Sequence, residues 1–177
     1  MAAPYETAAI ANWFLDRAER DGVQLSPMKL QKLIYFAHGW FLALTGNPLI
    51  DEHPQAWEYG PVIPSIYHEF KNFGRGAITD RATVFKFPEK SREGFSKFLS
   101  ARIVTPRLDD DADVEELLEQ IWKVYGHRSA VQLSNLSHES GGAWERAFRA
   151  AAGKKNVEIP DDLNAEEFEA KRARAAG

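Results

Sequence analysis

Residues 26–46, with the sequence SPMKLQKLIYFAHGWFLALTG, contain the clearest helix signal in the chain. Ser26 can cap a helix with its hydroxyl, and Pro27 suits the first helical position because the N–H that proline lacks is not needed there. Apolar residues recur at helical spacing on more than one face, which is typical of a helix buried on several sides. Gly46 supplies an end for it. We therefore predict a helix over residues 27–45 at the centre of the core.

Outward from this segment, apolar spacing predicts further helices separated by glycines and prolines. Residues 57–59 suit a short strand or an extended segment, and Gly60-Pro61 predicts a turn directly after them. The remaining predicted elements are helices over residues 7–20, 63–73, 92–100, 113–125, 129–138 and 144–151, and short strands over residues 84–87 and 102–104. The expected fold is mainly α, a single compact helical domain with a minor short β element.

The last part of the chain is more polar than the rest. Asn164 is a candidate cap for a final helix over residues 165–174, whose apolar content is little more than Phe168, so it needs a neighbour to pack against. We expect a domain over residues 1–153, in which residues 79–113 resemble a variable insert, followed by a polar C-terminal tail over residues 154–177 that can be helical.

Composition excludes several classes of protein. The chain has 177 residues, of which 44% are hydrophobic and 27% charged, as in folded soluble domains. The net charge of −4 argues against a dedicated nucleic-acid binder. The absence of cysteine excludes disulfides and thiolate chemistry. No apolar run approaches the roughly 20 residues that span a membrane. We expect a cytoplasmic protein with no membrane or nucleic-acid partner.

No complete catalytic or metal-binding motif is present. Residues 109–119 hold seven acids, but Val114 stands where a calcium loop needs glycine and Gln120 where it needs glutamate. His138-Glu139 begins like a zinc-protease helix, but Gly142 replaces the second histidine. We therefore predict no catalytic residue, no cofactor and no metal.

Three blocks of sequence occur together and in order. The first is residues 26–36, the second is Trp57-Glu58-Tyr59-Gly60-Pro61-Val62 followed by Pro64 and Tyr67, and the third comprises Tyr125, Gly126, Leu133, Ser134, Leu136, Ser137, His138 and Trp144. The combination resembles the Panacea antitoxin domain family, which includes GepA-like and SocA-like phage-associated proteins. The resemblance covers roughly residues 9–151. Ser26 stands where the family usually has threonine, and Gly142-Ala143 where relatives often have proline.

The resemblance implies an antitoxin, encoded beside a protein toxin that it neutralises by direct binding. It also implies that a SocA-like member can act as an adaptor that delivers the toxin to an ATP-dependent protease. The small residues at the C-terminus, 175–177, agree with such an adaptor, because small apolar C-termini can serve as handles for unfoldases. The oligomeric state is left open.

The candidate partner-binding residues are Lys29, Lys32, Trp57, Tyr59, Tyr67 and His138. A rigid Gly60-Pro61 turn would present the three aromatic residues as anchors for a partner. The alternative is that they complete the core, which the sequence favours for Trp57 and leaves open for Tyr59 and Tyr67.

The two lysines lie on an otherwise apolar helix, and their amines either reach solvent or line a pocket with Glu58 and His138. The alternative function is a hydrolase-like enzyme that uses His138, Glu139 and Glu58.

Overall fold

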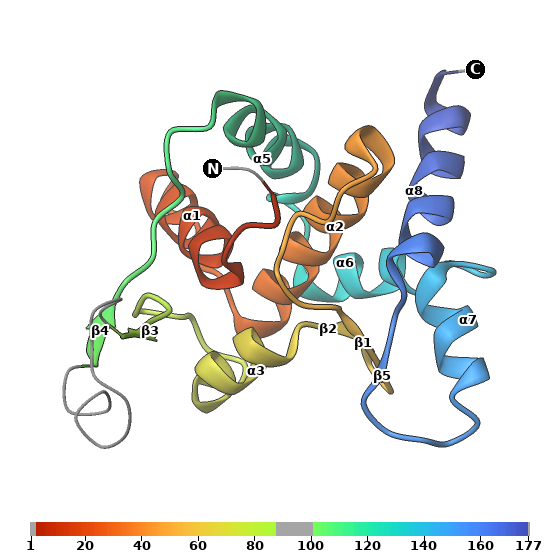
Figure 1. The fold of residues 1–177 in the computed structure, drawn as a ribbon, viewed down its shortest axis with the longest axis horizontal. Helices are drawn as coiled ribbons and strands as arrows, with labels where there is room; N and C mark the ends of the chain where they lie inside the picture. The colour runs from red at the N-terminus through yellow and green to blue at the C-terminus, as the bar shows by residue number, and fades with distance from the viewer. Residues whose placement is uncertain (1–2, 88–100, 177) are drawn as a thin grey trace.

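The computed structural model describes residues 3–87 and 101–176 of the chain. Figure 1 shows a mainly helical fold with short antiparallel strands, which confirms the predicted fold class. The helices are α1 (Thr7–Arg20), α2 (Pro27–Thr45), α3 (Pro64–Phe70), α5 (Ala112–Tyr125), α6 (Ala130–Ser137), α7 (Ala143–Ala150) and α8 (Asp161–Ala176), with a 3-10 turn η1 (Lys71–Phe73). The helix predicted over residues 92–100 lies outside the described residues.

Helix α2 occupies the centre of the molecule, as its sequence predicts. The Ser26 side chain accepts a hydrogen bond from the Lys29 backbone N–H at 3.3 Å, and Gly46 ends the helix with a φ of 71°. Helices α1, α3, α5, α6 and α8 all contact α2 (Figure 1). Burial of both faces therefore explains why its sequence is apolar around most of its circumference.

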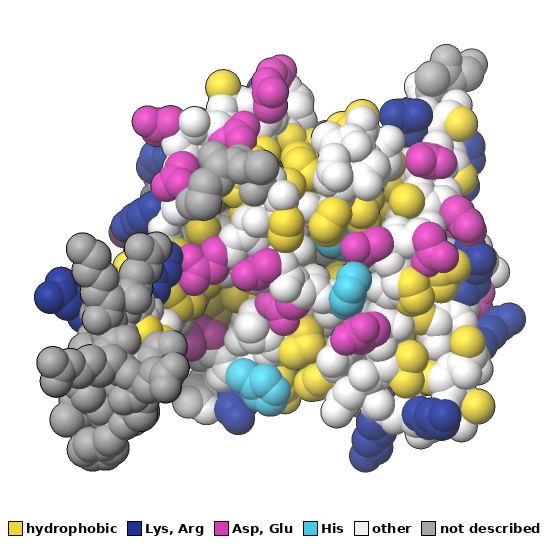
Figure 2. All heavy atoms as spheres, viewed as in Figure 1, with side chains coloured by type: hydrophobic (Ala, Val, Ile, Leu, Met, Phe, Trp, Pro, Cys, Tyr) yellow, Lys and Arg dark blue, Asp and Glu magenta, His cyan; other side chains and the backbone are white. Residues whose placement is uncertain are grey.

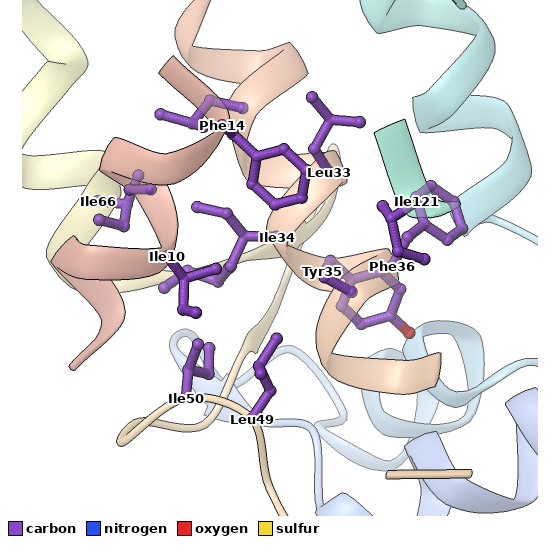
Figure 3. Close-up of a cluster of buried hydrophobic side chains, with 14 of the residues drawn as sticks. Ile10, Phe14, Leu33, Ile34, Tyr35, Phe36, Leu49, Ile50, Ile66 and Ile121 are labelled. Atoms are coloured by element: carbon purple, nitrogen blue, oxygen red, sulfur yellow. The ribbon is translucent and has the colours of Figure 1, made fainter. Parts of the chain in front are cut away.

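The core forms where α1, α2, α3 and α5 meet the segment that follows α2. Figure 3 shows the side chains converging from these elements. They include Ile10, Phe14, Leu33, Ile34, Phe36, Leu49, Ile50, Ile66 and Ile121, and each is at most 4% exposed. Complete burial of a side chain of this size stabilises the folded state by about 1.5–3 kcal/mol.

A small sheet lies against the helices. Strand β1 (Gln55–Trp57) pairs with β2 (Gly60–Val62) on one side and with β5 (Val157–Glu158) on the other, both antiparallel. The predicted turn at Gly60-Pro61 is wrong, because the chain turns at Glu58 and Tyr59 and Gly60 pairs with Trp57 within the hairpin. Pro61 is tolerated because β2 is an edge strand. A second antiparallel pair, β3 (Val84–Lys86) and β4 (Arg102–Val104), forms where strands were predicted.

The C-terminal helix packs against α2. It begins at Asp161, so Asn164 is not its cap; that prediction is wrong, and Asn164 is fully buried within the helix. Asp161 and Asp162 instead place negative charge in the first turn, where the helix dipole favours it. Phe168 is completely buried, with its ring centroid 5.5 Å from that of Trp40. Helix α8 thus obtains from α2 the apolar contact that its own sequence lacks.

Candidate interaction surface

Lys32 joins the β1–β2 hairpin to the central helix α2 by hydrogen bonds. Its side chain is 2% exposed, and its amine donates hydrogen bonds to the carbonyl oxygens of Pro61 at 3.0 Å and Tyr59 at 3.3 Å. Burial lowers the pKa of Lys32 to about 7. Between these carbonyls lies Gly60, with a φ of 105°, and a Cβ there would lie 2.5 Å from the amine. Glycine at this position lets the hairpin approach Lys32 closely.

Gln31 and Lys29, on the same helix as Lys32, also form hydrogen bonds to main-chain atoms of other segments. The Gln31 side chain accepts a hydrogen bond from the Ile63 N–H at 2.7 Å and donates one to the Ile63 oxygen at 3.1 Å. The Lys29 amine donates to the Gly126 oxygen at 2.5 Å, and burial lowers the pKa of this amine. The polar residues of the first sequence block therefore point inward to backbone atoms.

His138 and Trp144 also lie against the hairpin, and a Cβ on Gly60 would lie 2.9 Å from the His138 ring as well as close to the Lys32 amine. The His138 ring lies 4.0 Å from the Trp144 ring between centroids, and its Nδ1 is 2.5 Å from the Ser134 oxygen. The Trp144 indole N–H donates to the Trp57 oxygen at 2.9 Å. His138, directly after α6, and Trp144 of α7 thus meet the hairpin that α2 holds, which brings the three sequence blocks together.

Aromatic side chains reach the surface around this supported hairpin. Tyr59 at the turn is 73% exposed and Tyr67 on α3 is 37% exposed. Trp57 is half-buried, with its ring 4.8 Å from the Tyr67 ring, and Phe148 on α7 is 40% exposed and stacked on Trp144 at 5.1 Å. We call Trp57, Tyr59, Tyr67 and Phe148 the hairpin surface.

A groove of about 550 Å³ opens beside the hairpin surface. Its lining residues are Ala56, Trp57, Glu58, Phe148, Gly153, Lys154, Lys155 and Asn156. The sequence predictions missed Phe148, Lys154 and Lys155 as site residues. The apolar spacing that predicts a helix over residues 144–151 gives no sign that Phe148, within this range, stays partly uncovered.

The side chains of the alternative enzyme hypothesis are not assembled into a site. Glu139 pairs with Lys171 at 3.1 Å and with Arg174 at 2.8 Å, both on α8. Glu58 is exposed on the hairpin turn, and no hydrogen bond or ion pair joins it to His138 or Glu139 within residues 3–87 and 101–176. The described part of the chain also contains no group of acidic and histidine side chains suited to a metal ion.

Charge on the molecule is mixed. On the face shown in Figure 2, acidic side chains lie among apolar ones and basic side chains lie mainly toward the edges. This distribution offers no continuous basic area on the described part of that face, as a nucleic-acid backbone would require. None of the helices in the described ranges has the length and apolar character needed to cross a membrane.

Comparison with known proteins explains why these three blocks occur together. The model of the "Antitoxin SocA-like, Panacea domain" family matches residues 30–145. The chain belongs to this family. Antitoxin SocA of Caulobacter vibrioides (strain NA1000 / CB15N) is 36% identical over 140 residues, which cover 79% of this chain and 69% of that protein. No solved structure matches the chain.

Family membership confirms the resemblance seen in the sequence and supports an antitoxin role. The matched range includes Lys32, the hairpin, His138 and Trp144. It ends before Phe148 and the loop that carries Lys154 and Lys155, so the groove is built partly from residues beyond the matched range.

Proposed function

We propose that this protein is an antitoxin that neutralises a protein toxin, encoded beside it, by direct binding through the hairpin surface. The observation that carries the proposal is the exposure of Tyr59 on a turn whose flanking backbone is fixed by Lys32. Tyrosine and tryptophan are over-represented among residues that dominate binding energy. A turn that is already ordered loses little conformational entropy when a partner binds.

The six candidate residues divide into two roles in this proposal. Trp57, Tyr59 and Tyr67 contact the toxin, because each has ring surface open to solvent or next to an exposed ring. Lys29 and Lys32 are positioning residues, because both are buried and donate to backbone oxygens. His138 is also a positioning residue, since its ring packs on Trp144 behind the hairpin.

Co-expression with the product of the neighbouring gene tests the proposal. The neighbour expressed alone is expected to stop growth, and co-expression of this chain to restore it. Tyr59→Ala is expected to weaken binding of the purified toxin by about tenfold or more, which is the loss of about 1.4 kcal/mol or more expected of an anchor residue. Phe85→Ala is the matched control, because Phe85 is 70% exposed on β3 and lies outside the hairpin surface.

Two outcomes would contradict direct neutralisation through this surface: a neighbour that is harmless alone, or equal toxin affinity in Tyr59→Ala and the unmodified chain. The enzyme alternative makes a different prediction for His138→Ala. Under that alternative the variant binds toxin normally but no longer protects cells, whereas a positioning role makes binding and protection fall together.

The adaptor function implied by the family resemblance is part of the same proposal and has a separate readout. If the protein delivers the toxin to an ATP-dependent protease, co-expression shortens the half-life of the toxin. Restored growth with an unchanged toxin half-life would show that binding alone neutralises the toxin and would exclude the adaptor step.

A further inference from the structure

The groove beside the hairpin has two walls of different composition. Ala56, Trp57 and Glu58 of the hairpin form one wall, and residues 153–156, between α7 and β5, form the other. Phe148 contributes a further apolar surface from α7. A volume of about 550 Å³ lies within the range of roughly 300–1,000 Å³ that is typical of sites that bury most of a small ligand. The groove can therefore enclose one or two large side chains of a partner.

The wall that carries the lysines is ordered relative to the hairpin. The Lys154 N–H donates to the Ala151 oxygen at 2.9 Å, and Ala152, Gly153 and Asn156 have positive φ angles of 48°, 86° and 58°. This tight loop leads into β5, which pairs with the hairpin strand β1 at Ala56↔Val157. Since both walls are joined through one sheet, the groove does not need a partner in order to form.

The charges on this loop wall are available to a partner. Lys154 and Lys155 are exposed, and neither pairs with a carboxylate within the described ranges. The nearby arginines of α7 differ, because Arg146 pairs with Glu166 at 2.6 Å and Arg149 with Glu145 at 2.7 Å. Glu58 is the one carboxylate among the residues that line the groove. The groove thus combines an apolar interior with two unpaired positive charges on one wall.

We propose that this groove binds a short acidic segment of the toxin, with one aromatic or large aliphatic side chain placed between Trp57 and Phe148. Carboxylates of the segment face Lys154 and Lys155, and positions next to Glu58 carry no acid. The inference rests on the proposed function for the identity of the protein that contains the segment. The chemistry of the segment follows from the apolar interior and the charge of the loop wall.

A library of random nine-residue peptides displayed on phage, selected on the full chain, tests this chemistry without the toxin. The enriched peptides are expected to combine an aromatic or large aliphatic residue with at least two acidic residues. The Lys154→Glu/Lys155→Glu variant is expected to bind a synthetic copy of the most enriched peptide at least tenfold more weakly, and Glu58→Gln to bind it more tightly. The matched control is Lys71→Glu/Lys123→Glu, which reverses two exposed lysines outside the groove.

Several results would overturn the proposal: no enrichment, enrichment of neutral or basic peptides, or equal affinity in the groove variant and the control variant. A parallel titration with purified toxin separates this proposal from the proposed function. Toxin binding that is unchanged in Lys154→Glu/Lys155→Glu overturns the acidic-segment proposal and leaves the antitoxin function standing. Acidic peptides bound at the groove by a chain that binds no toxin would contradict the proposed function instead.

Discussion

Replacing Lys32 by methionine is expected to abolish a rise in stability between pH 7 and about pH 9.5. The Lys32 amine has a pKa of about 7 in the folded protein, against 10.5 when exposed. Between these values the unfolded chain binds a proton that the folded chain does not, so the free energy of unfolding increases with pH. The penalty for burying this amine is absent above about pH 10.5, where the amine is neutral in both states, and it grows as the pH falls to about 7.

The size of the effect follows from the pKa difference. Each pH unit within this window changes the free energy of unfolding by about 1.4 kcal/mol, so a rise from pH 7 to pH 9.5 adds about 3 kcal/mol. Lys32→Met removes this gain, and it also leaves the carbonyls of Tyr59 and Pro61 without their donor, at a cost of about 1–3 kcal/mol. Burial and the nearby Asp111 raise the pKa of Tyr5 to about 12, and its ordinary value of 10 also lies above the window. Lys29, whose pKa burial also lowers, is present in both proteins and cancels in the comparison.

Urea denaturation followed by tryptophan fluorescence, at four pH values between about 7 and 9.5, measures this difference. The unmodified protein and the control Lys123→Met, which changes an exposed lysine of α5, are expected to gain stability in parallel. Lys32→Met is expected to lack most of that gain. The same slope in all three proteins would refute the assignment of a buried, weakly basic amine to Lys32.

Three further substitutions test the packing. Gly39→Ala would place a methyl group against the Phe168 ring and is expected to lower the free energy of unfolding by about 2–3 kcal/mol in urea; adding Phe168→Leu is expected to recover part of the loss, and no recovery would argue against this contact. Gly60→Ala introduces a Cβ 2.5 Å from the Lys32 amine at a φ of 105°. It is expected to lower the free energy of unfolding by about 3 kcal/mol and to weaken toxin binding. Unchanged toxin affinity would count against a fixed hairpin. Ala152→Gly relieves a φ of 48° and is expected to raise Tm by about 2–4 °C in calorimetry, with a lower Tm as the contrary result.

The helical fold could be predicted because its signals are local. Ser26, Pro27 and Gly46 mark the ends of α2 by capping chemistry that acts within one turn of helix, and the predicted ends agree with the structure. Asn164 shows the limit of such signals. It has the composition of a cap, but Asp161 and Asp162 begin the helix earlier, and Asn164 is buried inside it.

The candidate site could be predicted only in part, because it depends on contacts between distant segments. Gly60 suggested a turn. Glycine is needed at this position because the amine of Lys32, 28 positions earlier in the sequence, approaches the backbone closely. The groove exists because β1 pairs with β5, about 100 residues later, and this pairing places Lys154 and Lys155 opposite Trp57. A two-residue strand such as β5 has too little sequence pattern to reveal its partner.

The side chains that hold the hairpin in place are different from the side chains that its tip presents to a partner. Lys32 donates hydrogen bonds to main-chain oxygens of the hairpin, Gln31 bonds the main chain of Ile63 directly after it, and Trp144 donates to the Trp57 oxygen. None of these bonds involves the side chains of Glu58 and Tyr59 at the tip of the hairpin. Those two positions can therefore diverge without loosening the framework. One inherited scaffold can in this way acquire new binding preferences by exchanging two outward-facing residues, much as an antibody domain varies its loops on a constant sandwich.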